Sequence, residues 1–283
     1  MQWTPGQMLV IALIGLVGGT LGGLLGLGGS VFIIPALTLL LGTNQHLYQA
    51  SALVANILVA GAATLRHRGR GTIRGDIVPV MATSTALAAF AGVLVSNLLE
   101  PKSLAAVFGI FLLYAAASEI RDLLRRSPDP EPPPTEGTRW KLGIWVGVIG
   151  GFVSGLLGIG GGAIMVPLLR RFGKLPVRQA VASSAAAMIV ACTVGAVAKN
   201  LSITELTDPS GMPLTTRAAL FLAVLLGPTA MLGGSIGAAL VYRLPITAIR
   251  CGLSLLLAFA GIRMLTVGGA QLLETVHSWL GGH

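Results

Sequence analysis

Charged residues are scarce in this sequence. They make up 10% of the 283 residues, whereas apolar residues make up 54%. Ordinary soluble domains contain roughly 25% charged residues. Several apolar runs reach the ~20 residues that a helix needs to cross a bilayer. We therefore expect an all-α polytopic membrane protein whose partner is the lipid bilayer, and the helical runs exclude a barrel.

Acidic residues and cysteines are also few. The 10 aspartates and glutamates fall in expected loops, the linker, the tail or helix ends, so a proton relay of buried carboxylates is not expected. The two cysteines, Cys192 and Cys251, lie in apolar segments without CxxC spacing, which indicates neither a disulfide framework nor a metal site. We expect no cofactor and no metal ion.

The net charge of +9 comes from basic residues that gather in short loops between the apolar runs. Such clusters orient helices in a membrane, because cytoplasmic loops are enriched in lysine and arginine. Membrane orientation therefore accounts for the charge, and nucleic acid is not an expected partner.

An internal duplication is the clearest pattern in the chain. The stretch GLLGLGGSVFIIP at 23–35 returns as GLLGIGGGAIMVP at 155–167, 132 residues later, and identities at the same offset extend from Gly15 to Leu37. Each half is then expected to contain a glycine-rich segment, a short helix and three long helices. The expected ranges are 8–26, 30–41, 48–66, 76–99 and 102–123, then 141–158, 162–172, 178–198, 217–241 and 246–268.

A proline-rich acidic segment, SPDPEPPPTEGT at 127–138, separates the halves. Prolines at this density cannot form a packed helix, which is typical of a solvated linker. We expect an N-terminal repeat at 1–126, this linker, and a C-terminal repeat at 139–283.

Most of the 19 basic residues lie in four places: 66–74, 121–141, 170–178 and 243–250. With all four in the cytoplasm, equivalent long helices of the two halves cross the membrane in opposite directions. The pattern therefore predicts inverted repeats, a cytoplasmic linker and periplasmic termini. Each glycine-rich segment with its short helix must then enter and leave the membrane on one side, as a hairpin.

The small residues that precede the short helices are Gly28, Gly29 and Ser30, and Gly160, Gly161 and Gly162. A helix break at membrane depth requires cover from protein, water or a ligand. A helix that restarts there presents unpaired amides and a positive dipole end, which favour an anion. We expect these six residues to bind substrate, and we assign the glycine ladders at 15–26 to helix packing.

The duplicated pattern LGxGGxxxxxP, at Leu25–Pro35 and Leu157–Pro167, resembles the TauE/SafE family of sulfite exporters and sulfonate transporters. An alanine-serine pair follows each copy, at Ala50-Ser51 and Ala182-Ser183. The resemblance covers nearly the whole chain and implies a transporter of a small sulfur-containing anion. It implies no individual binding residue, and Ser30 stands where the second copy has Gly162.

Polar side chains in the apolar runs complete the set of site candidates. Ser51 and Asn56 lie on the first long helix, and Ser183 and Ser184 on its equivalent. They could bind an oxyanion without a buried lysine or arginine, although each serine could instead bond to its own helix. We assign Ser96 to packing.

We therefore expect a secondary transporter of sulfite or an organosulfonate in the bacterial inner membrane, working by alternating access. An anion channel and a thiol-relay transporter that uses Cys192 remain alternatives. An intramembrane hydrolase is not expected, because no expected span contains a histidine or a serine-lysine pair. The glycine faces could also serve a homodimer.

Overall fold

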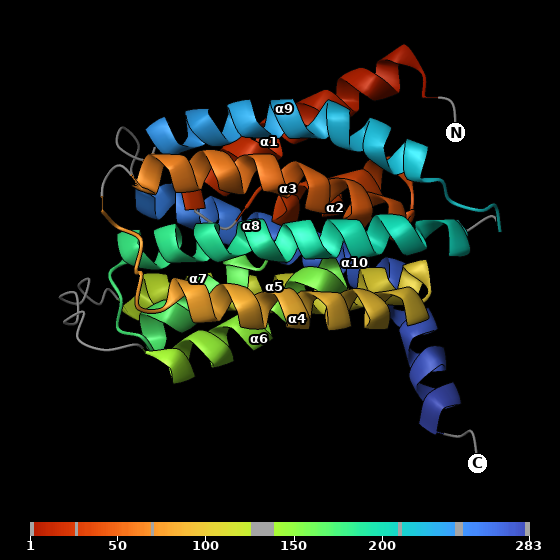
Figure 1. Cartoon of the computed structure of the whole chain (residues 1–283). Coiled ribbons are helices and arrows are strands. Elements are labelled where there is room, and N and C mark those ends of the chain that lie inside the picture. The colour runs from red at the N-terminus through yellow and green to blue at the C-terminus, as the bar shows by residue number, and fades with distance from the viewer. Residues whose placement is uncertain are drawn as a thin grey trace.

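The structure is a computed structural model that describes residues 3–25, 28–68, 71–125, 139–208, 211–240 and 246–280. These residues form a bundle of α-helices (Figure 1), and no strand is assigned among them. Gly26 and the linker expected at 127–138 lie outside the described residues. The helices are α1 Pro5–Leu25, α2 Ser30–Leu41, α3 Gln45–Arg68, α4 Val78–Leu98, α5 Pro101–Arg125, α6 Trp140–Leu157, α7 Gly162–Arg171, α8 Val177–Ser202, η1 Ile203–Glu205 (a short 3-10 helix), α9 Thr216–Leu240 and α10 Ile246–Leu280.

Eight helices of the described residues are long and apolar enough to cross a membrane. This confirms the expected all-α, multi-pass membrane protein. The helices α2 and α7 have 12 and 10 residues, about 18 Å and about 15 Å, so neither crosses the ~30 Å hydrocarbon core.

The order of helices agrees with the sequence, but several helix ends differ: α10, for example, continues to Leu280 rather than ending at 268, and two other ends bear on the site. The helix α3 begins at Gln45 rather than at residue 48, and α8 continues to Ser202 rather than ending at 198. Polar residues at these ends look like loop residues in the sequence, yet they are buried and hydrogen-bonded. The expectation that no span contains a histidine was therefore wrong, because His46 lies on the first turn of α3.

Glycines bring the long helices into close contact in equivalent pairs. A Cβ on Gly19 of α1 would meet the backbone of Ala230 on α9, and a Cβ on Gly151 of α6 would meet the backbone of Thr85 on α4. In both pairs, glycines farther along one helix contact residues farther along the other, so the two helices of each pair are parallel. The close approach explains the small residues at this spacing.

The halves also meet through equivalent helices. His46, at the start of α3, contacts Lys199 near the end of α8, whereas Leu53 contacts Gly195, so these two helices are antiparallel. The pair α5 and α10 is antiparallel in the same way, because Gly109 contacts Gly261 while Gly268 contacts Lys102.

Each short helix turns back along the helix before it. A Cβ on Gly18 of α1 would contact Ile33 of α2, and a Cβ on Gly150 of α6 would contact Met165 of α7. These two pairs are related by the offset of 132 residues found in the sequence. The duplication thus extends to the way that each short helix packs.

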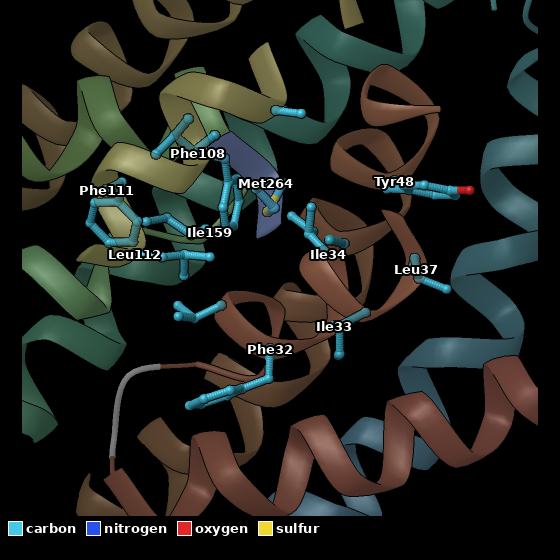
Figure 2. Packing of buried hydrophobic residues seen from close by; sticks show 14 of the residues in the cluster. Phe32, Ile33, Ile34, Leu37, Tyr48, Phe108, Phe111, Leu112, Ile159 and Met264 are labelled. Carbon is cyan, nitrogen blue, oxygen red and sulfur yellow. The ribbon is translucent and has the colours of Figure 1, made fainter. Parts of the chain in front are cut away.

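The short helix α2 and the start of α7 lie in the largest apolar cluster of the described residues. Figure 2 shows α2 entering it with Phe32, Ile33 and Ile34. Ile159, between α6 and α7, belongs to the same cluster as Phe108 and the other labelled side chains of α5. Burial of these apolar side chains stabilises the position of both helix breaks, before α2 and before α7, between the long helices.

Loops at one end of the bundle are rich in arginine and contact one another. Arg139 donates a hydrogen bond to the carbonyl of Gly173 at 2.8 Å. Arg74 forms an ion pair with Asp76, donating from Nε and Nη2 to the two carboxylate oxygens at 2.8 Å each. These hydrogen bonds hold the pKa of Asp76 below its ordinary value, although desolvation opposes the effect. We call this end the basic end.

Candidate functional site

The first helix break ends at Gly28 and Gly29. Gly28 has φ +83°, a left-handed conformation that favours glycine. Gly29 occupies the N-cap of α2 without a side-chain cap, and its carbonyl accepts from the amides of Phe32 and Ile33. Gly28, Gly29 and Ser30 are all buried.

The second break repeats this geometry with more left-handed residues. Gly158, Gly160 and Gly161 have φ of +75°, +76° and +81°. Gly161 is the N-cap of α7, again without a side-chain cap. Within the described residues, the amides of Gly161, Gly162 and Ala163 have no hydrogen-bond partner. Such amides at a helix start are the donors that anions use in proteins.

The two breaks lie against each other. A Cβ placed on Gly28 would lie 3.6 Å from the carbonyl oxygen of Ile159 and 3.7 Å from Sδ of Met188 on α8. A Cβ on Gly160 would approach Sδ of the same methionine to 2.7 Å. Met188 therefore lies beside both breaks. Cys192, one turn farther along α8, is fully buried and lies beside Gly160 as well.

Ser30 and Asn56 form the polar contact of the first break. The amide Nδ2 of Asn56 donates to Oγ of Ser30 at 2.8 Å, and both side chains are buried. The residues 132 positions later are Gly162 and Met188, which have no such hydrogen bond. The two breaks are thus alike in backbone and different in side chains.

The other three candidate serines, Ser51, Ser183 and Ser184, have different partners in the structure. Ser51 donates to the carbonyl of Leu47 at 2.7 Å, and Ser184 to that of Val181 at 3.0 Å, which is the bonding within one helix weighed for them above. Ser183 accepts from the backbone amide of Arg74 at 3.1 Å, toward the basic end. Their role in binding substrate remains a prediction.

A buried lysine at the opposite end of the bundle was missed by the sequence reasoning. Lys199 is 0% exposed, although no lysine was among the site candidates taken from the sequence. Its Nζ lies 2.9 Å from Nδ1 of His46, 2.7 Å from Oγ of Ser96 and 2.7 Å from Oδ1 of Asn97. We call these four residues the Lys199 cluster. They come from α3, α4 and α8, and the only sequence signal is a lysine at the end of an apolar run.

Gln49 connects the Lys199 cluster to the second break. Ser96 donates to Oε1 of Gln49 at 2.9 Å, and Nε2 of Gln49 donates to the carbonyl of Leu156 at 3.0 Å. A Cβ on Gly158 would lie 2.9 Å from Cα of Gln49. A continuous chain of hydrogen bonds therefore runs from Lys199 to the residues that precede α7.

The distance between Ser96 and Lys199 would suit a serine-lysine catalytic pair. A nucleophilic serine must donate its proton to the base. Here the Ser96 proton goes to Gln49, so Lys199 donates to Ser96 instead. The direction of these bonds is opposite to that of an activated nucleophile.

Two cavities of the described residues lie outside the breaks and are apolar. One, of about 470 Å³, lies between α1, α2 and α10, and the other, of about 460 Å³, between α6 and α7. Six lining residues of the second stand 132 positions after six of the first: Leu142, Trp145, Val146, Ile149, Leu168 and Phe172. Apolar walls offer no donors to an anion, so we do not place the site there.

Comparisons with known proteins agree with the pattern of helices. The family described as "Sulfite exporter TauE/SafE" matches residues 11–264. The chain is 25% identical to the probable membrane transporter protein YunE of Bacillus subtilis over 283 residues, covering 93% of this chain and 98% of the relative. It is 27% identical to a probable membrane transporter protein of Haemophilus influenzae, covering 91% and 97%.

A longer relative is the probable membrane transporter protein MamO of Magnetospirillum gryphiswaldense, which is 24% identical and matches 92% of this chain. The chain spans 45% of the length of that protein. No solved structure matches. Since the family match extends over nearly all of the helices described above, the chain belongs to the TauE/SafE family.

Proposed function

We propose that this protein is a secondary transporter that carries a small sulfur-containing anion, sulfite or an organosulfonate, across the bacterial inner membrane. One observation carries the proposal: two helix breaks with uncapped starts are in contact inside the bundle. Main-chain amides at helix starts suit an anion that must be released again, because they carry no full positive charge. The family match supports the sulfur-containing substrate.

Alternating access is supported by the arrangement of the halves. Equivalent helices α3 and α8 are antiparallel, as inverted repeats require, and the equivalent breaks meet between the halves. Carriers built from inverted repeats hold substrate between broken helices and expose it to each side in turn. Both breaks are buried in this structure.

We propose the orientation with the basic end in the cytoplasm and both termini in the periplasm. Arginine-rich loops of the two halves share this end, in accord with the enrichment of lysine and arginine in cytoplasmic loops. The membrane potential would then favour export of an anion by about 2.3 kcal/mol per charge at 100 mV.

Transport by the purified protein in proteoliposomes tests the proposal. Sulfite, sulfate, thiosulfate and sulfoacetate are compared for uptake and for counterflow, which a carrier shows and a channel does not. Gly28→Val places an isopropyl group toward Ile159 and Met188, between the breaks, at a residue with φ +83°, and we expect it to abolish transport. Gly61→Val, on α3 where a Cβ has open space, is the matched control. Wild-type transport by Gly28→Val would reject the proposed site.

A further inference from the structure

The Lys199 cluster carries a positive charge that no neighbouring carboxylate offsets. Glu100 and Glu205, at the same end of the bundle, are exposed, and neither forms an ion pair with Lys199. The partners of Lys199 within the described residues are a hydroxyl, an amide oxygen and an imidazole. A buried cation without a counter-ion is costly in any protein interior.

The charge follows from counting protons in the cluster. The carbonyl of Leu99 can only accept, so Nε2 of His46 carries a hydrogen and donates to it at 3.0 Å. The carbonyl of Leu156 likewise fixes the amide of Gln49, so its Oε1 accepts the proton of Ser96. Ser96 therefore has only lone pairs to offer to Lys199.

Asn97 is oriented by a similar constraint. Ser202 donates to the carbonyl of Ala198, so its oxygen accepts from Nδ2 of Asn97 at 2.8 Å. The amide oxygen of Asn97 then faces Nζ of Lys199 and can only accept. Each of the three contacts of Lys199 needs a hydrogen between its two heavy atoms. The three hydrogens are present only when Lys199 and His46 together hold one proton more than in their neutral forms. The pair carries one positive charge, whichever nitrogen holds that proton.

We propose that the Lys199 cluster is a second anion-binding site, at the end of the protein opposite the basic end, which holds a small oxyanion before it reaches, or after it leaves, the helix breaks. Lys199 donates its hydrogens to Ser96, Asn97 and His46 in this structure, so an arriving oxyanion replaces one of these acceptors and supplies the missing negative charge. Gln49 links this site to the second break through Leu156. The identity of the anion as a sulfur oxyanion rests on the proposed function.

Direct binding of ³⁵S-labelled sulfite to the full-length protein in nanodiscs tests the site. We expect Lys199→Met, which keeps the length of the side chain without its charge, to weaken binding at least tenfold, about 1.4 kcal/mol. Lys199→Arg keeps the charge and should bind within about threefold of wild type, because guanidinium also donates to oxyanions. Lys102→Met removes a lysine that is exposed at the same end and should bind as wild type does.

Asn97→Asp separates an anion site from a purely structural lysine. The new carboxylate takes the position of an anion beside Nζ, so we expect higher thermal stability without sulfite together with at least tenfold weaker sulfite binding. A structural lysine would gain the stability and leave sulfite binding unchanged. Wild-type sulfite binding by both Lys199→Met and Asn97→Asp would overturn the proposal.

The outcomes also distinguish this site from the helix breaks. If Lys199→Met binds sulfite more weakly and Gly28→Val still transports as wild type does, the site at the helix breaks is rejected and the Lys199 site is kept. The reverse pattern would reject the Lys199 site and keep the proposed transport through the breaks.

Discussion

The hydrogen bond between Asn56 and Ser30 offers a quantitative test of how the first break is held. Ser30→Gly converts it to the residue that the second break has at Gly162, and it leaves the buried Nδ2 of Asn56 without its acceptor. An unpartnered buried donor costs about 1–3 kcal/mol. We expect Ser30→Gly to lower the free energy of unfolding by this amount.

Adding Asn56→Met installs the whole pair of the second repeat, Gly162 with Met188, in the first. The double variant should recover part of the loss, because no polar group is then left unpartnered. Double-mutant cycles give about 0.6 kcal/mol on average for hydrogen bonds between membrane helices, and up to about 1.7 kcal/mol. We expect the larger figure here, since both groups are fully enclosed.

Unfolding by sodium dodecyl sulfate in mixed micelles, followed by circular dichroism, measures the four free energies of the cycle. Thr193→Ala is the control, because that exposed hydroxyl bonds only to the carbonyl of Ile189 in its own helix. It should change the free energy of unfolding by no more than about 0.5 kcal/mol. A coupling energy below about 0.3 kcal/mol between Ser30 and Asn56 would refute the reasoning.

Three further predictions concern the second break, the thiol and the basic end. In Gly161→Ala the alanine must adopt φ +81°, with its Cβ 2.7 Å from the carbonyl oxygen of Gly150, so this variant should unfold at a lower detergent concentration than wild type. The control Gly61→Ala, whose Cβ has open space on α3, should be as stable as wild type or more stable. Equal effects of the two substitutions would contradict a strained backbone at the break. Cys192→Ala should retain sulfite transport in proteoliposomes, because the thiol is buried and has no polar partner among the described residues; loss of transport in a folded variant would favour the thiol relay. Asp76 has a lowered pKa in the folded protein, so its ion pair with Arg74 stabilises the fold above pH 3.8, and this stabilisation is lost as the pH falls below that value. Asp76→Asn should therefore be less stable than wild type at pH 7 and should lose less stability on acidification. Thermal unfolding measured against pH checks both.

The glycine breaks could be predicted because their cause is local. Consecutive small residues before an apolar helix, repeated at a fixed offset, indicate a restart of the helix in any context, and the structure has α2 and α7 where the sequence predicts them. The contact between Gly28 and Ile159 lies beyond such reasoning, since it depends on how two halves pack.

The Lys199 cluster could not be predicted, because its members come from three separate helices. His46 and Lys199 lie in the sequence at positions where an apolar run ends, and polar residues there usually face water. In the structure α3 begins three residues earlier than expected and α8 ends four residues later, so His46 and Lys199 lie inside the helix bundle. Ser96 was assigned to packing because one hydroxyl in a span has no preferred partner from sequence alone.

The different side chains at the two helix breaks have a consequence for the direction of transport. If the two repeats of a carrier were identical, exchanging their conformations would give two states of the same energy, related by a two-fold axis. Asn56 and Ser30 are locked together in one half, while Met188 and Gly162 leave the other half free of that lock. Under the proposed alternating access, a sequence difference of this kind gives the two states unequal energies, so we expect the empty protein to be open more often toward one compartment.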